Sequence, residues 1–268
     1  MADKRLLTIQ DISCVGQCSL TVALPIISAC GVECGILPSS VLSNHTAGYS
    51  GWTFFDLTDE MPKKENVKFD AFYTGYVSKA QIPHILRIME EAANEGALRI
   101  VDPVMGDGGK LYPGFDDDFP QEMCKLCKGA DVIMPNMTEA ALMLGEEYRT
   151  EYDQAYIEDM LKRLYALGAK NVLLTGVSFE EGKLGIAYYN GNETKYYFTE
   201  RIPVSMHGTG DCYASSFAGA LMRGHDILDA ASIAADFVAE TIRQTMGDES
   251  HWWGVKFEKA LPYLISRM

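Results

Sequence analysis

Basic residues are scarce in this sequence. It has 23 Lys and Arg against 37 Asp and Glu, which gives a formal net charge of −14 over 268 residues. Proteins that hold nucleic acid backbones or anionic membrane surfaces need basic surfaces or polybasic segments, so we expect neither partner here. The charge of an anionic ligand would have to be met locally, by a metal ion or by backbone amides.

Long apolar runs and a dense cysteine framework are also missing. No stretch approaches the roughly 18–20 apolar residues of a membrane span, and the opening residues run into a predicted strand rather than a signal peptide. Seven cysteines in so long a chain do not make a disulfide scaffold, so we predict a cytoplasmic protein with reduced thiols. Zinc at the C-x3-C pairs Cys14/Cys18 and Cys30/Cys34 is an alternative to buried thiols. It is disfavoured because the pairs flank a predicted strand–helix–strand unit.

What the sequence does contain is an alternation of strands and helices. Strands are predicted at 5–10, 70–76, 97–104, 130–136 and 171–176, and helices at 17–30, 79–94, 137–144, 153–167, 211–223 and 227–245. Asn190-Gly191, between two alternating segments, predicts a hairpin. This order predicts an α/β fold in a single domain, residues 1–268, with a mostly parallel central sheet and helices on both faces. Ligands of such sheets bind beyond the carboxyl ends of the strands, where the unusual residues of this chain lie.

The richest of these strand-end motifs is M-H-G-T-G-D, residues 206–211, ahead of an apolar helix. Two glycines in three residues let the backbone turn tightly and approach a ligand closely. At a helix N-terminus the outward amides and the helix dipole favour an anion. Asp211 would be a general base, taking a proton from a hydroxyl that attacks a bound phosphoryl group. A plain turn with an N-cap explains these residues equally well. The predicted anion hole comprises Gly208, Thr209, Gly210 and Asp211.

A second motif, V-D-P-V-M-G-D at residues 101–107, places two carboxylates just past a predicted strand. Asp102 is well placed to bind Mg²⁺ or its waters, because magnesium in phosphoryl-transfer sites uses one or two carboxylates plus phosphate oxygens. In the glycine-rich stretch that follows, Lys110 is a candidate phosphate contact and Tyr112 a candidate cover for the site. The alternative is a solvated turn, which Gly and Asp also favour.

A third motif, P-N-M-T-E at residues 135–139, follows the next predicted strand. Asn136 at a helix N-cap and Glu139 three residues later have the spacing of a capping box. Their side chains would also face the metal–phosphate centre predicted around Asp102, with Glu139 as a second metal ligand. The coincidence of three such strand ends favours this interpretation over capping alone.

These motifs together resemble the ribokinase-like superfamily, and within it the vitamin B6 kinases (pyridoxal or pyridoxamine kinases). G-T-G-D and D-P-V-M-G-D mark the superfamily, whereas S-N-H-T at residues 43–46 and T-G-Y at 74–76 are similar to the B6 branch. The similarity spans nearly the whole chain. It implies ATP-dependent phosphorylation of the 5′-hydroxymethyl group of a B6 vitamer by a homodimer, with Mg²⁺ and often a monovalent cation such as K⁺ or Na⁺.

The resemblance also assigns residues that the motifs alone did not. It implies that Thr175 and Val204 lie by the nucleotide, and that Asp102, Asn136 and Glu139 serve the phosphate–metal centre. The pyridine site would be lined by Ser43, His45, Thr46, Tyr76 and the residue at position 11. Many B6 kinases have I-Q-S there, but this chain has Asp11. A carboxylate would favour pyridoxamine or pyridoxine over pyridoxal, unless Asp11 points away and caps a loop.

Other functions stay open at this point. A hydroxymethylpyrimidine kinase of the same superfamily also phosphorylates a flat heteroaromatic alcohol, although S-N-H-T argues against it. A non-catalytic nucleotide-binding protein has no need of Asp211 beside an anion hole. A dinucleotide-dependent oxidoreductase is disfavoured because the first strand lacks a G-x-G-x-x-G turn.

Overall fold

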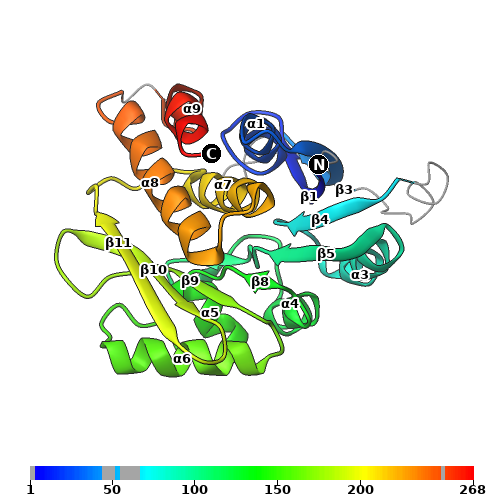
Figure 1. Cartoon of the computed structure of the whole chain (residues 1–268). Helices are drawn as coiled ribbons and strands as arrows, with labels where there is room; N and C mark the ends of the chain where they lie inside the picture. Colours follow the sequence, from blue (N-terminus) through cyan, green and yellow to red (C-terminus); the bar gives the residue numbers. More distant parts are fainter. Residues whose placement is uncertain (1–3, 44–51, 55–66, 249–250) are drawn as a thin grey trace.

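A twisted central sheet with helices on both faces makes up the fold in the computed structural model, which describes residues 4–43, 52–54, 67–248 and 251–268 (Figure 1). The strands of this sheet are β1 (Arg5–Ser13), β2 (Glu33–Leu42), β3 (Trp52–Phe54), β4 (Phe69–Thr74), β5 (Ala93–Val101), β8 (Val132–Ile133), β9 (Val172–Val177), β10 (Lys183–Tyr189) and β11 (Thr194–Glu200). Their order is β11-β10-β9-β8-β5-β4-β1-β2-β3. The short strands β6 (Gly106–Asp107) and β7 (Lys110–Leu111) pair separately.

The pairing confirms the predicted mostly parallel sheet. Every neighbouring pair from β2 through β9 is parallel, and antiparallel pairing is limited to β3 against β2 and to the β9–β10–β11 edge. The predicted hairpin joins β10 to β11. In its turn, the Asn190 side chain accepts hydrogen bonds from the amides of Asn192 and Glu193, both at 3.0 Å.

Helices cover both faces of the sheet, as predicted (Figure 1). One layer contains α1 (Leu20–Ala29), α7 (Thr209–Arg223), α8 (Ile227–Thr245) and α9 (Phe257–Ser266). The other contains α3 (Ile82–Glu91), α4 (Phe119–Cys127), α5 (Met137–Leu144) and α6 (Gln154–Ala166), with a short 3-10 turn, η1 (Lys79–Gln81), ahead of α3. No described helix is long and apolar enough to cross a membrane.

Alternation along the central strands gives each layer its own core. In β1, Leu6 packs into the core under α1 and α7, whereas Leu7 packs into the core on the opposite face. In β4, Tyr73 and Phe72 alternate in the same way, because successive side chains of a strand point to opposite faces. Each fully buried side chain of this size stabilises the fold by about 1.5–3 kcal/mol relative to an exposed one. The strand ends are therefore fixed between two packed layers.

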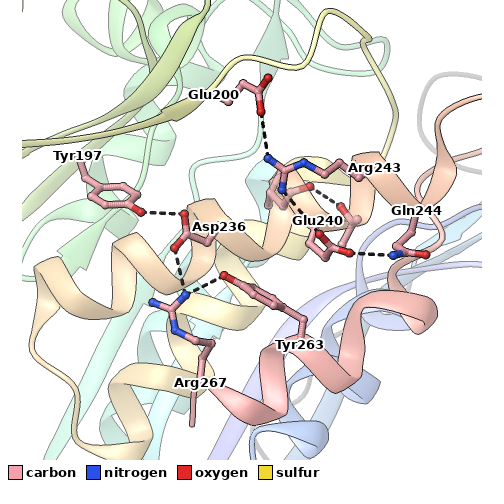
Figure 2. Close-up of polar contacts among 10 residues, drawn as sticks. Tyr197, Glu200, Asp236, Glu240, Arg243, Gln244, Tyr263 and Arg267 are labelled. Atoms are coloured by element: carbon pink, nitrogen blue, oxygen red, sulfur yellow. Dashed lines mark hydrogen bonds and ion pairs between the residues drawn. The ribbon is translucent and has the colours of Figure 1, made fainter.

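Polar contacts tie the hairpin edge to the helices beside it (Figure 2). Asp236 in α8 accepts hydrogen bonds from Tyr197 in β11, at 2.7 Å, and from Arg267 after α9, at 3.1 Å. About two turns further along α8, the Arg243 guanidinium pairs with Glu200 at the end of β11, at 3.3 Å. These contacts hold the end of β11 against α8, which is where one wall of the cavity described below lies.

Some predicted boundaries were wrong. The helix predicted to reach residue 94 ends at Glu91, and β5 already starts at Ala93. Gly96, just beyond the predicted helix and of a type that often ends one, lies inside β5 with φ +76°, where the pairing with β4 shifts register. Glycine often marks such an irregularity in a strand as well as a helix end, so the residue type did not discriminate. Strands β3, β6 and β7 and helices α4 and α9 were not predicted.

The seven cysteines are all free thiols, spread over both layers. Within the part of the chain that the structure describes, no group of three or more His, Cys, Asp or Glu side chains is arranged to hold a metal ion. Cys18, Cys30, Cys127 and Cys212 are buried. Burial raises the pKa of the Cys30 thiol to about 12, which keeps it protonated.

Candidate active site

A cavity of about 940 Å³ lies beyond the carboxyl ends of the parallel strands. Ser19 lines it after β1, Tyr76 after β4, Asp102 after β5 and Asn136 after β8. The start of α7 and the segment after β11 form the rest of its wall. Motifs that are far apart in the sequence thus meet at one place. The predicted residues that line the cavity are Tyr76, Asp102, Tyr112, Asn136, Glu139, Thr175, Val204, Gly208, Thr209, Gly210 and Asp211.

Helix α7 begins in a conformation that only glycine tolerates easily. Gly208 is its N-cap, with φ +81° in the left-handed region. A Cβ atom at this position would lie 1.9 Å from the carbonyl oxygen of Gln17, so a side chain cannot fit. The first backbone hydrogen bond of the helix runs from the Cys212 amide to the Gly208 carbonyl, at 2.9 Å. The amides of residues 209–211 come before that bond and have no acceptor within the helix.

Gly210 differs from Gly208 in what surrounds it. A Cβ atom built on Gly210 meets no atom within 4 Å, and its φ lies outside the left-handed region. The residue is exposed and lines the cavity. Its missing side chain therefore leaves free space over the amides at the start of α7, which a ligand can enter.

Asp211, in the first turn of α7, has an unusually basic carboxyl group. Burial is the main cause, and the nearby charge of Asp11 adds to it, whereas the backbone of Ser19 favours the ionised carboxylate. The balance raises the pKa of Asp211 to about 7. A carboxyl with such a pKa is suited to accept a proton near neutral pH.

Asp102 and Glu139 form a second acidic centre in the cavity. Burial and the neighbouring carboxylates of Glu139 and Asp211 raise the pKa of Asp102 well above its usual range. Burial raises the pKa of Glu139 to about 8, although backbone amides that donate to it work in the opposite direction. Two buried carboxylates that disfavour each other's charge would both be stabilised by a cation between them.

The predicted capping box at the start of α5 is present. The Glu139 amide donates to Asn136 Oδ1, and the Asn136 amide donates to Glu139 Oε2, both at 2.9 Å. Glu139 Oε1 also accepts from the Met105 amide at 3.1 Å, and Asn136 Nδ2 donates to the Gly106 carbonyl at 3.0 Å. Both side chains therefore fix the loop after β5 while lining the cavity.

Lys110 is not brought into this cavity. It is exposed in β7, on the small hairpin, and the cavity wall does not include it. The cationic side chain in the wall is instead that of Arg201, directly after β11, which also lines a neighbouring cavity of about 350 Å³. Arg201 follows the predicted hairpin, but residue types alone do not determine the strand register that returns it to the site.

Asp11 is also placed differently from the prediction. Its side chain is fully buried in β1 and does not line the cavity. Its two carboxylate oxygens accept hydrogen bonds from the hydroxyls of Ser19, at 2.5 Å, and Ser13, at 3.1 Å. The direct ring contact predicted for Asp11 is therefore replaced by contacts within the protein. Ser19, which the sequence reasoning missed, occupies the cavity wall instead.

The predicted substrate-binding residues are only partly described. Tyr76 lines the cavity and packs its ring on Phe115, with centroids 5.0 Å apart. Ser43 is exposed just after β2 and is not in the cavity wall. His45 and Thr46 lie outside the described residues. At the opposite side, Thr175 lines the cavity in β9, and its hydroxyl is 3.4 Å from the Pro135 carbonyl oxygen.

Comparison with known proteins assigns the chain to a family. The α/β fold matches that of solved pyridoxal kinases, and the relatives place the chain among the small-molecule kinases of the ribokinase-like superfamily. Residues 63–253 match the family described as phosphomethylpyrimidine kinase, and these residues are more than half of the chain. The chain belongs to that family, and it is an enzyme. The predicted relationship to the vitamin B6 kinases is confirmed by the relatives described next.

Two solved structures resemble the chain over almost its whole length. One is a protein of Bacteroides thetaiotaomicron VPI-5482, crystallised with pyridoxal and provisionally described as a phosphomethylpyrimidine kinase; it is 38% identical, with a TM-score of 0.90 over 98% of this chain and 96% of that one. The other is pyridoxal kinase from Lactobacillus plantarum, 34% identical, with a TM-score of 0.86 over 98% and 97%. The pyridoxal kinase PdxY of Granulibacter bethesdensis is 26% identical over 259 residues, covering 90% of this chain and 89% of that protein.

Proposed function

We propose that this enzyme transfers the γ-phosphoryl group of ATP to the 5′-hydroxymethyl group of a vitamin B6 vitamer. The observation that carries the proposal is the position of Asp211, a carboxyl with a raised pKa beside the free amides of α7, in the cavity that Asp102 also lines. Two relatives at 34% and 38% identity, named for pyridoxal kinase or crystallised with pyridoxal, support the substrate class.

In the proposed reaction the substrate hydroxyl attacks the γ-phosphorus in line with the bond to the β–γ bridging oxygen. The new O–P bond forms as the bridging O–P bond breaks, ADP leaves, and the hydroxyl proton passes to Asp211. The amides of residues 209–211 donate hydrogen bonds to the phosphoryl oxygens, whose negative charge they stabilise without a basic side chain. Most of the catalysis would come from positioning and from this fixed polar environment.

The buried carboxylates fit a divalent cation. Asp102 would bind Mg²⁺ directly or through water, because its charge is disfavoured in the protein alone. Glu139 already accepts hydrogen bonds from backbone amides, so we place it at the outer side of that site, oriented by α5. Mg²⁺ bound here would neutralise the negative charge of the phosphates, because a chain of net charge −14 supplies little positive charge of its own.

The pH dependence of kcat/KM should report the ionisation of Asp211. Because its pKa is raised to about 7 and the base must be deprotonated, kcat/KM is expected to be constant above about pH 7 and to fall as the pH drops below it. Protonation of Asp102 acts in the same direction and would steepen the fall. The check is kcat/KM for the vitamer between pH 5.5 and 8.5, with the fold followed by circular dichroism. A profile that stays flat down to pH 5.5, as for a carboxyl with the usual pKa near 4, would contradict the role of a base with a raised pKa.

Alanine variants of Arg201 and Lys110 make a matched test of which basic side chain binds the nucleotide phosphates. Arg201→Ala is expected to raise KM for ATP by about tenfold, since a charge-assisted hydrogen bond to phosphate is worth about 1.5–3 kcal/mol. Lys110→Ala removes an exposed charge outside the cavity wall and should leave KM for ATP near the wild-type value. Equal effects of the two variants, measured by steady-state kinetics, would place the phosphates elsewhere.

A turnover screen tests the proposed activity. Pyridoxal, pyridoxamine, pyridoxine and hydroxymethylpyrimidine are each incubated with MgATP, and ADP release is measured by a coupled assay. We expect turnover of at least one B6 vitamer with a higher kcat/KM than that of hydroxymethylpyrimidine. The second candidate, hydroxymethylpyrimidine kinase activity, is favoured by the family match itself and would be indicated by the reverse order. ATP binding without turnover of any compound would instead indicate a nucleotide-binding protein.

A further inference from the structure

Ser19 stands out in the backbone of the cavity wall. It has φ +57° and ψ −133°, and among the described residues it is the non-glycine residue with positive φ. A side chain in such a conformation is held there by its surroundings, and strain of this kind concentrates at functional sites. Ser19 lies between β1 and α1, is 5% exposed, and lines the cavity close to α7.

Four sets of contacts hold Ser19 in place. Its hydroxyl donates to Asp11 Oδ1 at 2.5 Å, and its backbone forms a bridge with Ile12. Its carbonyl accepts hydrogen bonds from the amides of Val22, at 3.0 Å, and Ala23, at 2.8 Å, which open α1. Its backbone also stabilises the ionised carboxylate of Asp211. The strained conformation therefore places the backbone of one loop beside the proposed base.

The same loop is fitted to α7 at a second point. The carbonyl oxygen of Gln17 occupies the space where a Cβ of residue 208 would lie, 1.9 Å from the ideal Cβ position. The Gln17 amide in turn donates to the Trp253 carbonyl at 3.2 Å. Residues 17–19 thus pack directly against the start of α7, and a change in the Ser19 backbone would be transmitted to Asp211.

We propose that Asp11 is a positioning residue, which acts through Ser19 to orient the carboxylate of Asp211 for proton transfer. Asp11 does not line the cavity, so it acts without touching substrate. The negative charge of Asp11 also acts on Asp211 through space, because it disfavours the ionised form of Asp211. This inference rests on the proposed function, in which Asp211 is the base.

Other groups also face Asp211 and bear on its protonation. Cys18 comes from the same loop as Ser19, and Cys212 follows Asp211 in α7. The charge of Asp211 also raises the pKa of Tyr73 of β4, of Asp102 after β5 and of Tyr112 after β7. Asp11 is the carboxylate among these neighbours that accepts a hydrogen bond from Ser19, whose backbone favours the ionised form of Asp211.

The charge of Asp11 is tested with Asp11→Asn, which keeps the shape of the side chain and an oxygen that can accept the Ser19 hydroxyl. We expect kcat to fall by about tenfold, the low end for a residue that orients a catalytic group from outside the site. KM for ATP and for the vitamer should stay unchanged, and the acidic limb of the pH profile should move to lower pH because a like charge is removed. A change in vitamer KM at constant kcat would show that Asp11 contacts substrate, and would overturn the proposal.

The link through Ser19 is tested with Ser19→Gly, because glycine adopts the positive φ without strain but lacks the hydroxyl. We expect this variant to fold normally, to lose about tenfold to 100-fold in kcat, and to exchange the amide proton of residue 19 faster than wild type in an NMR hydrogen-exchange measurement. Ser13→Ala is the matched control, since Ser13 bonds the other oxygen of Asp11 and not Ser19. It should keep the wild-type kcat and exchange rate.

The amide exchange keeps the two hypotheses separable. If wild type phosphorylates no B6 vitamer, the proposed function fails, but slow exchange at residue 19 that is lost in Ser19→Gly still supports the ordering of this loop by its hydroxyl. If wild type is active and Ser19→Gly matches it in both kcat and exchange, the positioning role of Asp11 is wrong.

Discussion

Asp211→Asn should lower kcat for a B6 vitamer by at least about 100-fold, the loss expected when a general base is removed. Asn has nearly the same size and shape but cannot take the proton from the substrate hydroxyl. The helix start and its amides stay in place, so the variant should still bind MgATP. Steady-state kinetics of purified wild type and variant, with ATP affinity measured separately by calorimetry, provide the check.

The stability of the same variant gives an independent control. A carboxyl whose pKa is raised on folding, as that of Asp211 is, opposes folding once the pH lies above its usual range. At pH 8 the Asp211→Asn variant should therefore melt at a temperature equal to or above that of wild type. Lost activity together with a lower melting temperature would point to damage to the fold. A kcat within tenfold of wild type would remove Asp211 from the role of base.

Gly210→Ala is expected to keep the fold and to lower kcat/KM by about 100-fold. The added methyl group meets no protein atom within 4 Å, but it occupies the free space over the amides at the start of α7. Loss of one donor of an oxyanion site costs about that factor in other enzymes. Melting temperature and kinetics are measured on the same preparation, and the expected result is an intact fold with poor catalysis.

Gly208→Ala is the comparison that makes this result interpretable. Here the residue has φ +81°, and its Cβ would collide with the Gln17 carbonyl oxygen at 1.9 Å. This variant should lose stability as well as activity. If Gly210→Ala destabilised the protein as much as Gly208→Ala, the space beside Gly210 would not be open as the structure has it. If Gly210→Ala kept full activity, the phosphoryl group would bind elsewhere.

Much of the site could be predicted because it depends on a general property of parallel sheets. The motifs after β5 and β8 and the G-T-G-D turn are separated by up to about a hundred residues, yet all face one cavity. The rule that ligands bind at the carboxyl ends of strands brings such motifs together without any knowledge of packing. The capping box of Asn136 and Glu139 was predictable for a different reason, because its spacing is a local feature of the chain.

The residues that sequence reasoning misplaced depend on non-local geometry. Lys110 was chosen for its place near Asp102 in the sequence, but the small β6–β7 hairpin holds it away from the cavity. Arg201 reaches the site only because β10 and β11 return along the sheet edge in a specific register. Ser19 carried no signal at all, since a strained φ and a backbone contact cannot be read from residue type. The catalytic and binding roles themselves stay predictions.

Asp11 shows why a resemblance does not determine a residue's contacts. The expected change from Ser to Asp in the pyridine site suggested a new contact with substrate. In the structure, two serine hydroxyls satisfy the carboxylate inside the protein. Whether a side chain at the end of β1 points into the cavity or between the layers depends on the bulge in its pairing with β2, between Gln10 and Ile12. No residue pattern in the sequence predicts that bulge.

The most direct test of the central claim is a crystal structure of the protein with Mg²⁺, a non-hydrolysable ATP analogue and pyridoxine. The account requires that the 5′-hydroxyl lie about 3 Å from the Asp211 carboxylate, at hydrogen-bond distance, with the terminal phosphate on the amides of residues 209–211. A ternary complex in which the hydroxyl is turned away from Asp211, or in which the terminal phosphate lies away from the start of α7, would contradict it.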